Sequence, residues 1–234
     1  MRRRRAKKRG QQELFPKNPK GAGRPKMKFG ASEPHRERPK LAMTDPVHVT
    51  IRAVREVGTL RRRNVYRAVR RALVTTFARD SFRVVHLSIQ RDHIHLLVEA
   101  DDRLALARGM QGFQISAAKH INRSMTRRRR GTVFPDRYHA TIIDSRKQAR
   151  HALAYVLNNW RKHRDPLARA YRIDPYSTAA SFDGWRDLAD AARYFPSTYD
   201  PLPAFAPRTW YLRDGWRRYG RIATRERPGA RAPA

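Results

Sequence analysis

Hydrophobic and polar residues alternate along four stretches of the chain, the pattern of strands with one buried face. These stretches are residues 46–52, 82–90, 93–100 and 137–143. Apolar residues recur every three or four positions in three further segments, which predicts amphipathic helices. The segments are residues 61–79, 103–125 and 145–163. Only Arg91 and Asp92 separate the second strand from the third, so these two strands are expected to form an antiparallel hairpin.

The order of these elements, β-α-β-β-α-β-α, predicts the fold class. It favours an α+β fold, with a ferredoxin-like, mainly antiparallel sheet and helices on one face. The last helix has a clear start signal, because Ser145 and Gln148 have the spacing of a capping box.

The charge of the chain divides it into parts. The sequence has 53 Lys and Arg against 20 Asp and Glu, a formal net charge of +33, and a charge of this size attracts polyanions. Residues 1–40 are basic and nearly free of large apolar side chains, which predicts a flexible basic arm. Residues 41–164 contain all the predicted strands and helices and form the central domain, and residues 165–234 form a C-terminal extension containing Pro, Trp and Arg.

The composition also excludes some chemistry. The 234-residue sequence has no cysteine, which excludes disulfides, zinc-thiolate sites and thiol nucleophiles. Neither a membrane-length apolar run nor the apolar region of a secretory signal is present. We therefore expect a cytoplasmic protein with no membrane partner.

Two histidines stand out on the third strand. Alternation places His93, His95 and Glu99 on one face of residues 93–100. Histidines at i and i+2 of a strand can give one metal ion two nitrogen ligands, although two polar histidines on a solvated face would have the same pattern. His48 and His86 could flank the site or simply face solvent, and Glu99 could support the site from behind or pair with an arginine.

The last predicted helix has a polar stripe. His151, Tyr155 and Asn159 follow one another at intervals of four residues, so they share one side of the helix. A tyrosine can act as a nucleophile, and an asparagine oxygen can bind a hard divalent cation. Tyr155 could instead simply pack, and His151 could hydrogen-bond near Tyr155 or lie on the surface.

Three motifs together resemble a known family. His93-Ile94-His95, the segment Tyr155-Val-Leu-Asn158-Asn159 and the early strand His48-Val49-Thr50-Ile51-Arg52 are similar to those of the HUH single-tyrosine transposases. The resemblance is to the IS200/IS605-like enzymes, especially the branch associated with repetitive extragenic palindromes (REP). It covers residues 46–163 and has the family's order of elements.

The resemblance implies a site and a reaction. Tyr155 matches the nucleophile that attacks single-stranded DNA, which leaves a 5′-phosphotyrosine link and a free 3′-OH. His93 and His95 match the metal ligands, and Asn159 stands where the family has a third ligand, often a longer Gln. The implied ion is Mg²⁺ or Mn²⁺, and the implied partner is a hairpin-forming DNA end. The family also implies a possible homodimer, in which helix and histidine pair can come from different subunits.

Arginines are the expected contacts to DNA phosphates. The predicted DNA-binding residues form two runs and one position in the arm: Arg61, Arg62, Arg63, Arg127, Arg128, Arg129, Arg130 and Arg24. Arg24 belongs to Gly23-Arg24-Pro25-Lys26, which resembles the core of an AT-hook, although a solvated arm that holds phosphates without specificity explains it too. Aromatic residues beside arginines in the C-terminal extension could stack on unpaired bases or dock on the domain.

Two other functions remain open at this point. His48-Val-Thr50, His86-Leu-Ser88 and His139-Ala-Thr141 have the form used by two-histidine phosphoesterases, which need neither metal nor tyrosine. A basic nucleic-acid-binding protein without catalytic activity would also account for the charge.

Overall fold

The computed structural model describes residues 39–76, 79–127, 129–189, 195 and 198–229. The predicted basic arm with Arg24, the apolar position Phe77 and the loop residue Arg128 lie outside the described residues. Within them, no helix is long and apolar enough to cross a membrane.

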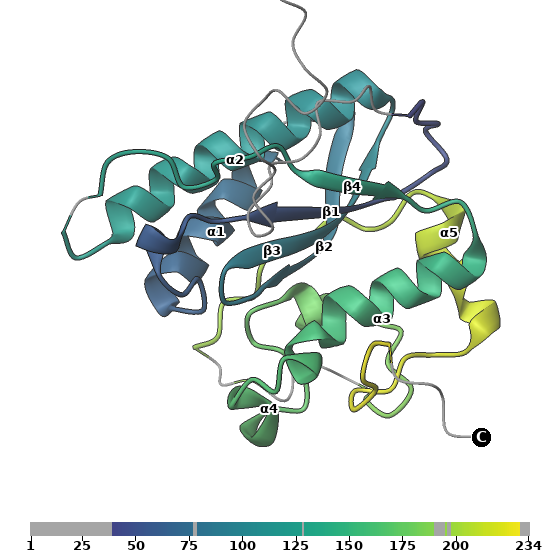
Figure 1. The fold of residues 1–234 in the computed structure, drawn as a ribbon. Coiled ribbons are helices and arrows are strands. Elements are labelled where there is room, and N and C mark those ends of the chain that lie inside the picture. The colour runs from purple at the N-terminus through teal and green to yellow at the C-terminus, as the bar shows by residue number, and fades with distance from the viewer. Residues whose placement is uncertain (1–38, 77–78, 128, 190–194, 196–197, 230–234) are drawn as a thin grey trace, which may run out of the picture. The chain divides into compact units, whose positions relative to one another are not determined.

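A four-stranded sheet lies at the centre of the described chain (Figure 1). Its strands are β1 (Val47–Arg52), β2 (Phe82–Ile89), β3 (His93–Ala100) and β4 (His139–Ile142). They are ordered β2-β3-β1-β4, and every neighbouring pair is antiparallel. This is the order of a ferredoxin-like sheet, so the predicted α+β class and the β2–β3 hairpin are confirmed.

Two helices cover one face of the sheet (Figure 1). They are α1 (Arg63–Thr76) and α2 (Arg103–Ser124), and they pack on each other as well as on the strands. β3 contributes Ile94, Leu96 and Val98 to this core, all fully buried. Its other residues point to the opposite face, since side chains alternate along a strand.

A β-bulge alters the predicted alternation in β2. The pairing with β3 shifts between Val84 and His86, because one extra residue is inserted into the strand there. Val84 consequently joins the core under α1 and α2, while Val85 packs on the opposite side. The simple alternation, which put Val85 with Leu87, is wrong at this point.

The opposite face of the sheet is covered by α3 (Arg146–Lys162) (Figure 1). Ser145 caps the helix by accepting a hydrogen bond from the backbone N–H of Gln148. The side chain of Gln148 reaches back to the N–H of Asp144, one residue earlier than in the usual capping box. The last predicted helix thus begins where its capping signal predicts.

The C-terminal extension wraps the outer side of α3. Its short helical elements are α4 (Leu167–Ala170), η2 (Thr178–Ser181), α5 (Trp210–Arg213) and η4 (Gly215–Tyr219). A further short turn, η1 (Arg55–Val57), follows β1 in the central domain. Trp185 and Trp216 are buried against α3, as a docking role for the extension requires. Trp210 is 45% exposed and is therefore left accessible. α3 thus packs on the sheet with one side and on the extension with another.

Candidate metal and tyrosine site

The histidine pair of β3 lies on the face of the sheet that α3 covers. The Nε2 atoms of His93 and His95 are 3.0 Å apart, and their rings meet edge to face. His93 is partly exposed and His95 is 4% exposed. Two imidazole nitrogens therefore converge at one point between sheet and solvent.

The outer nitrogens of the two rings are held by other side chains. Nδ1 of His93 lies 2.6 Å from Oδ1 of Asp92. Burial acts to raise the pKa of Asp92, but the hydrogen bond with His93 and the charges of His93 and Arg52 together outweigh it and lower this pKa. The ionised carboxylate can only accept, so Nδ1 of His93 donates and Nε2 keeps its lone pair. In His95, Nδ1 lies 3.0 Å from the Thr50 hydroxyl, which can donate or accept, and Nε2 is turned to His93.

Burial keeps the inner histidines neutral. It lowers the pKa of His95 to about 2, with further lowering from His48 and His93. Burial also lowers the pKa of His48 to about 4, and His139 adds to this. Nε2 of His48 lies 3.2 Å from Nδ1 of His95. The predicted flanking histidine His48 is thus a direct neighbour of His95.

The predicted nucleophile lies beside this pair. The ring of Tyr155 is 5.1 Å from the ring of His95 and 5.6 Å from that of His48, centroid to centroid. The ammonium of Lys162 lies 5.3 Å from the centre of the Tyr155 ring, so a positive charge accompanies the phenol. One chain supplies the tyrosine and both histidines.

Asn159 follows Tyr155 by one helical turn and is completely buried. Neither its amide oxygen nor its amide nitrogen has a hydrogen-bond partner. An unsatisfied buried amide costs about 1–3 kcal/mol, so this side chain has capacity for a ligand that the protein itself does not supply.

These residues fit a divalent cation. Two nitrogens bound at 2.1 Å to neighbouring corners of an octahedral ion lie about 3 Å apart, close to the separation of the two Nε2 atoms. Among the described residues, no cluster of three or more His, Cys, Asp or Glu could hold a metal. Such an ion would therefore need His93, His95 and a ligand of another type, such as the Asn159 oxygen.

The site contains four residues that sequence reasoning missed. Asp92 and Thr50 hold the ligand histidines, and Lys162 accompanies Tyr155. The ring of His163 lies 6.0 Å from that of His93. His163 and Lys162 could have been found from the sequence, since they continue the stripe of Tyr155 and Asn159 at the end of the helix.

Two predicted supporting residues lie elsewhere. The Glu99 carboxylate accepts hydrogen bonds from the backbone N–H groups of Arg208 and Thr209 and from the Thr209 hydroxyl, which anchors the C-terminal extension. His151 is exposed on α3.

The three His-x-Thr/Ser motifs do not form one site. His86 is buried against Thr178 and Phe182 of the C-terminal extension. His48 and Thr50 both contact His95. His139 stands on β4, where it pairs with Thr50 of β1.

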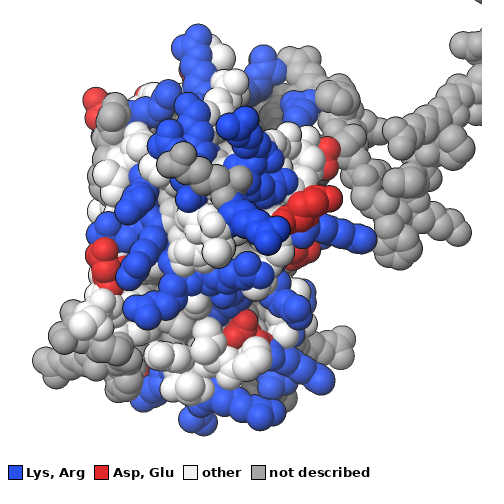
Figure 2. Space-filling view, turned by 90° about the vertical axis from the view of Figure 1, so that its left-hand side faces the viewer, with Lys and Arg blue, Asp and Glu red and all other residues white. Residues whose placement is uncertain are grey.

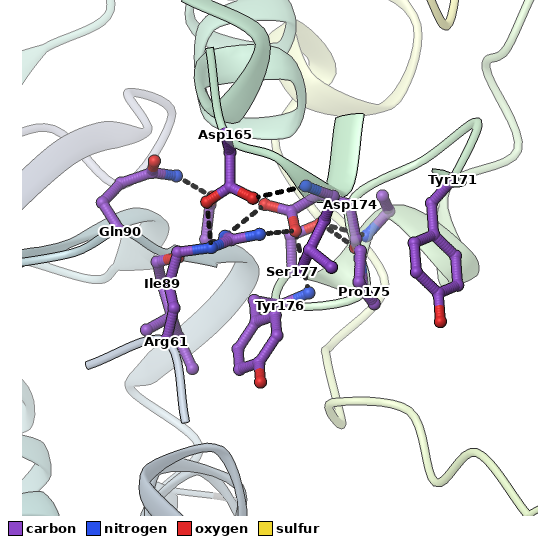
Figure 3. A network of polar contacts seen from close by, with 12 residues as sticks. Arg61, Ile89, Gln90, Asp165, Tyr171, Asp174, Pro175, Tyr176 and Ser177 are labelled. Atoms are coloured by element: carbon purple, nitrogen blue, oxygen red, sulfur yellow. Dashed lines mark hydrogen bonds and ion pairs between the residues drawn. The ribbon is translucent and has the colours of Figure 1, made fainter. Parts of the chain in front are cut away.

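The prediction that Arg61 binds DNA is wrong. Its guanidinium is buried, forms ion pairs with Asp165 and Asp174, and donates to the carbonyl of Ile89 (Figure 3). Burial acts to lower the pKa of Arg61, but Asp174 and then Asp165 outweigh it and raise the pKa. Arg61 is thus neutralised by two carboxylates inside the protein. Because these partners lie about a hundred residues away in the sequence, the basic run alone does not reveal them.

The other predicted DNA contacts separate into two groups. Arg129 folds into its own loop, where it donates to Asn122 and to the carbonyl of Thr132. The exposed members are Arg62, Arg63, Arg127 and Arg130. Figure 2 shows Lys and Arg covering much of the side on which α1 and the C-terminal end of α2 lie.

Comparison with known proteins adds to this geometry. Residues 45–159 match the family model described as "Transposase IS200 like". A solved structure of a REP-associated tyrosine transposase bound to a REP hairpin has a similar fold, with a TM-score of 0.52 and 14% sequence identity, over 75% of this chain and 98% of that one. No curated protein sequence matches. The matched segment contains both histidines, Tyr155 and Asn159, and the match identifies residues 45–159 of this chain as an IS200-like transposase domain.

Proposed function

We propose that this transposase is a metal-dependent single-strand DNA transesterase that cleaves and rejoins DNA through Tyr155. The observation that carries the proposal is the combination of three features in one chain: two convergent imidazole nitrogens, a tyrosine ring with its centroid 5.1 Å from that of His95, and a buried amide with no partner one helical turn after this tyrosine. A structural site would have little reason to leave Asn159 unsatisfied.

The residues have distinct roles in the proposed site. His93, His95 and Asn159 would hold Mg²⁺ or Mn²⁺, which when bound would polarise the phosphodiester and stabilise charge on the leaving oxygen. Asp92 and Thr50 hold the two imidazoles in orientation. Lys162 places a positive charge beside the phenol of Tyr155.

The proposed reaction exchanges one phosphodiester for another. The phenolic oxygen of Tyr155 forms a bond to phosphorus while the bond between phosphorus and the 3′ oxygen breaks. The departing 3′ oxygen gains a proton and the phenol loses one, so the step is balanced without hydrolysis. Rejoining is the reverse reaction with a new 3′-OH. The bond energy is conserved in the tyrosine link, which suits a transposase.

The proposed DNA partner is a single strand with a hairpin. The charge of +33 and the exposed arginines of α1 support phosphate binding, and the similar solved protein is bound to a REP hairpin. A homodimer stays a prediction, to be checked by light scattering with and without hairpin DNA.

The test is covalent capture of DNA. The full chain is incubated with Mn²⁺ and a labelled single strand that carries a hairpin from its own genomic flanks, and an SDS-resistant adduct is sought. We expect an adduct with the wild type and with the control variant Tyr219→Phe, whose side chain is 49% exposed. Tyr155→Phe and EDTA should both abolish it.

The same assay separates the other two functions. Hydrolysis that persists in EDTA and yields no adduct would favour a two-histidine phosphoesterase, for which the neighbouring motifs on β1 and β4 are available. DNA binding without adduct or hydrolysis would leave a binding protein only. Either outcome would contradict the proposed function.

A further inference from the structure

A second pocket lies outside the tyrosine site, between α1 and the C-terminal extension. It has a volume of about 480 Å³, which is in the range of pockets for small molecules and nucleotides. The residues of its extension wall lie beyond the family match at residues 45–159; they are Leu167, Tyr171, Pro175, Tyr176, Phe195, Thr198, Tyr199 and Asp200. The pocket is thus formed where the matched domain and the extension meet.

Aromatic rings form much of the pocket. The rings of Phe195 and Tyr199 are nearly parallel, with centroids 4.1 Å apart, and the ring of Tyr171 is stacked with that of Phe195 at 6.2 Å. Tyr66 meets Tyr176 edge to face. Such rings offer flat surfaces on which an unpaired base can stack.

One side of α1 supplies the charge. Arg63, Tyr66, Arg67 and Arg70 line the pocket at intervals of three and four residues, so they share one face of the helix. Arg70 pairs with Asp200 and donates to the carbonyl of Pro201, which fixes the wall. Arg63 and Arg67 are exposed, and no ion pair joins them to the described residues, so both are available for phosphate.

A buried network connects the pocket with the catalytic helix. The Arg61 guanidinium lies 4.6 Å from the ring centre of Tyr176, a wall residue. The same guanidinium pairs with Asp165, and Asp165 donates its N–H to the carbonyl of Trp160 in α3 (Figure 3). The ring of His163, at the end of α3, in turn faces His93. Pocket and tyrosine site therefore adjoin the same end of α3.

We propose that this pocket binds an unpaired nucleotide of the DNA strand that Tyr155 cleaves, with the base among the aromatic rings and its phosphates on Arg63 and Arg67. The inference rests on the proposed function for the identity of the strand. Stacking on aromatic rings does not select a base, because every base has a flat face that can stack. We therefore expect the affinity of the pocket to depend little on base identity.

The test measures the affinity of fluorescein-labelled hexathymidylate at 0.15 M salt by anisotropy. All proteins carry Tyr155→Phe, so covalent capture does not contribute. Tyr171→Ala should weaken binding about tenfold, because stacking of one base is lost, whereas Tyr171→Phe should retain binding within about twofold. An abasic strand of the same length should not distinguish these two variants.

Matched charge variants test the phosphate contacts without disturbing the aromatic wall. The double variant Arg63→Ala/Arg67→Ala should weaken binding about tenfold. Arg55→Ala/Arg108→Ala removes the same charge from exposed positions that do not line the pocket, and it should have a clearly smaller effect. All four arginines are exposed, so folding should be preserved.

One binding result would overturn the proposal that the pocket binds a nucleotide. It is overturned if Tyr171→Ala and Arg63→Ala/Arg67→Ala both bind hexathymidylate within twofold of the parent protein. Photocrosslinking gives an independent readout, with 5-iodouracil placed in the single-stranded flank of the hairpin. We expect the label on the peptide that contains Tyr171 and Tyr176, and its absence there would count against the pocket. Adduct formation at Tyr155 in wild-type protein is scored separately, so failure of the pocket and failure of the proposed reaction are distinguishable.

Discussion

The two faces of the sheet are built from the same strands and differ in almost every other respect. Under α1 and α2 the buried side chains are apolar, including Ile94, Leu96 and Phe113. Under α3 the buried set includes His86, His95 and Asn159. One strand, β3, supplies both faces by alternation. Both faces also bury apolar side chains. The face under α1 and α2, the dry face, therefore serves mainly for packing, whereas the face under α3, the polar face, combines packing with groups that can carry chemistry.

Adjacent residues of β3 give the largest contrast. Ile94→Ala, on the dry face, should lower the free energy of unfolding by about 3 kcal/mol, because it leaves a cavity in a fully buried core. His93→Ala should cost less than about 1 kcal/mol, since His93 is partly exposed, yet it should reduce DNA cleavage more than about 100-fold. Urea denaturation and the adduct assay measure the two effects. Equal losses of stability in the two variants would remove the distinction between the faces.

Two glycines of α2 test how tightly the dry face is packed. A Cβ on Gly109 would lie 2.1 Å from the Phe82 ring, so Gly109→Ala should cost about 2 kcal/mol through overpacking. A Cβ on Gly112 would meet only the end of the Arg79 side chain at 3.2 Å. Gly112→Ala should therefore leave stability unchanged or raise it by up to about 1 kcal/mol, as helix propensity predicts. Thermal unfolding of the two variants decides this, and a Gly109→Ala protein as stable as wild type would contradict it.

The polar face should be sensitive to acid. Burial lowers the pKa of His86 to about 4, and the charge of Asp183 opposes this only in part. The unfolded chain, with a pKa near 6.5, binds a proton more readily. The contribution of neutral His86 to the free energy of unfolding is therefore fully present above pH 6.5 and is lost as the pH falls toward 4. About 2 kcal/mol of it is lost by pH 5.

His86→Gln isolates this contribution. The variant should lose less unfolding free energy than wild type between pH 7 and pH 5, although other histidines also titrate. An unchanged pH dependence would assign the acid sensitivity to other groups.

The smallest expected effect concerns the orientation of one ligand. Asp92→Asn leaves a hydrogen bond to His93 but removes the carboxylate that fixes its tautomer. We expect the Mn²⁺ concentration for half-maximal cleavage to rise about tenfold, while cleavage at saturating Mn²⁺ changes little. A fall in the saturated rate with an unchanged Mn²⁺ requirement would show that Asp92 does not act through metal binding.

The sequence predicts those parts of the molecule that depend on local periodicity. Alternation and helical spacing give the strands, the helices and the faces of β3, and the capping signal gives the start of α3 at Ser145. The bulge between Val84 and His86 is not visible in the sequence, because Val84 and Val85 are both apolar and either could face the core under α1 and α2.

Long-range partners are the second limit. Nothing near Arg61 in the sequence indicates that it pairs with Asp165 and Asp174. The run of arginines therefore predicts an exposed surface, although Arg61 is buried. The contact of Thr50 with His95 depends in the same way on the pairing of β1 with β3. Side chains on one strand or helix can be grouped from sequence, whereas contacts between elements require the register.

We propose that the phenolic oxygen of Tyr155 forms a covalent bond to a DNA phosphate, and mass spectrometry tests this most directly. Adduct formed with Mn²⁺ and hairpin DNA is trimmed with nuclease, digested with protease and sequenced. We expect a nucleotide joined through its 5′-phosphate to Tyr155 and to no other residue. A link on another side chain, or a phosphate joined from the 3′ side, would contradict it.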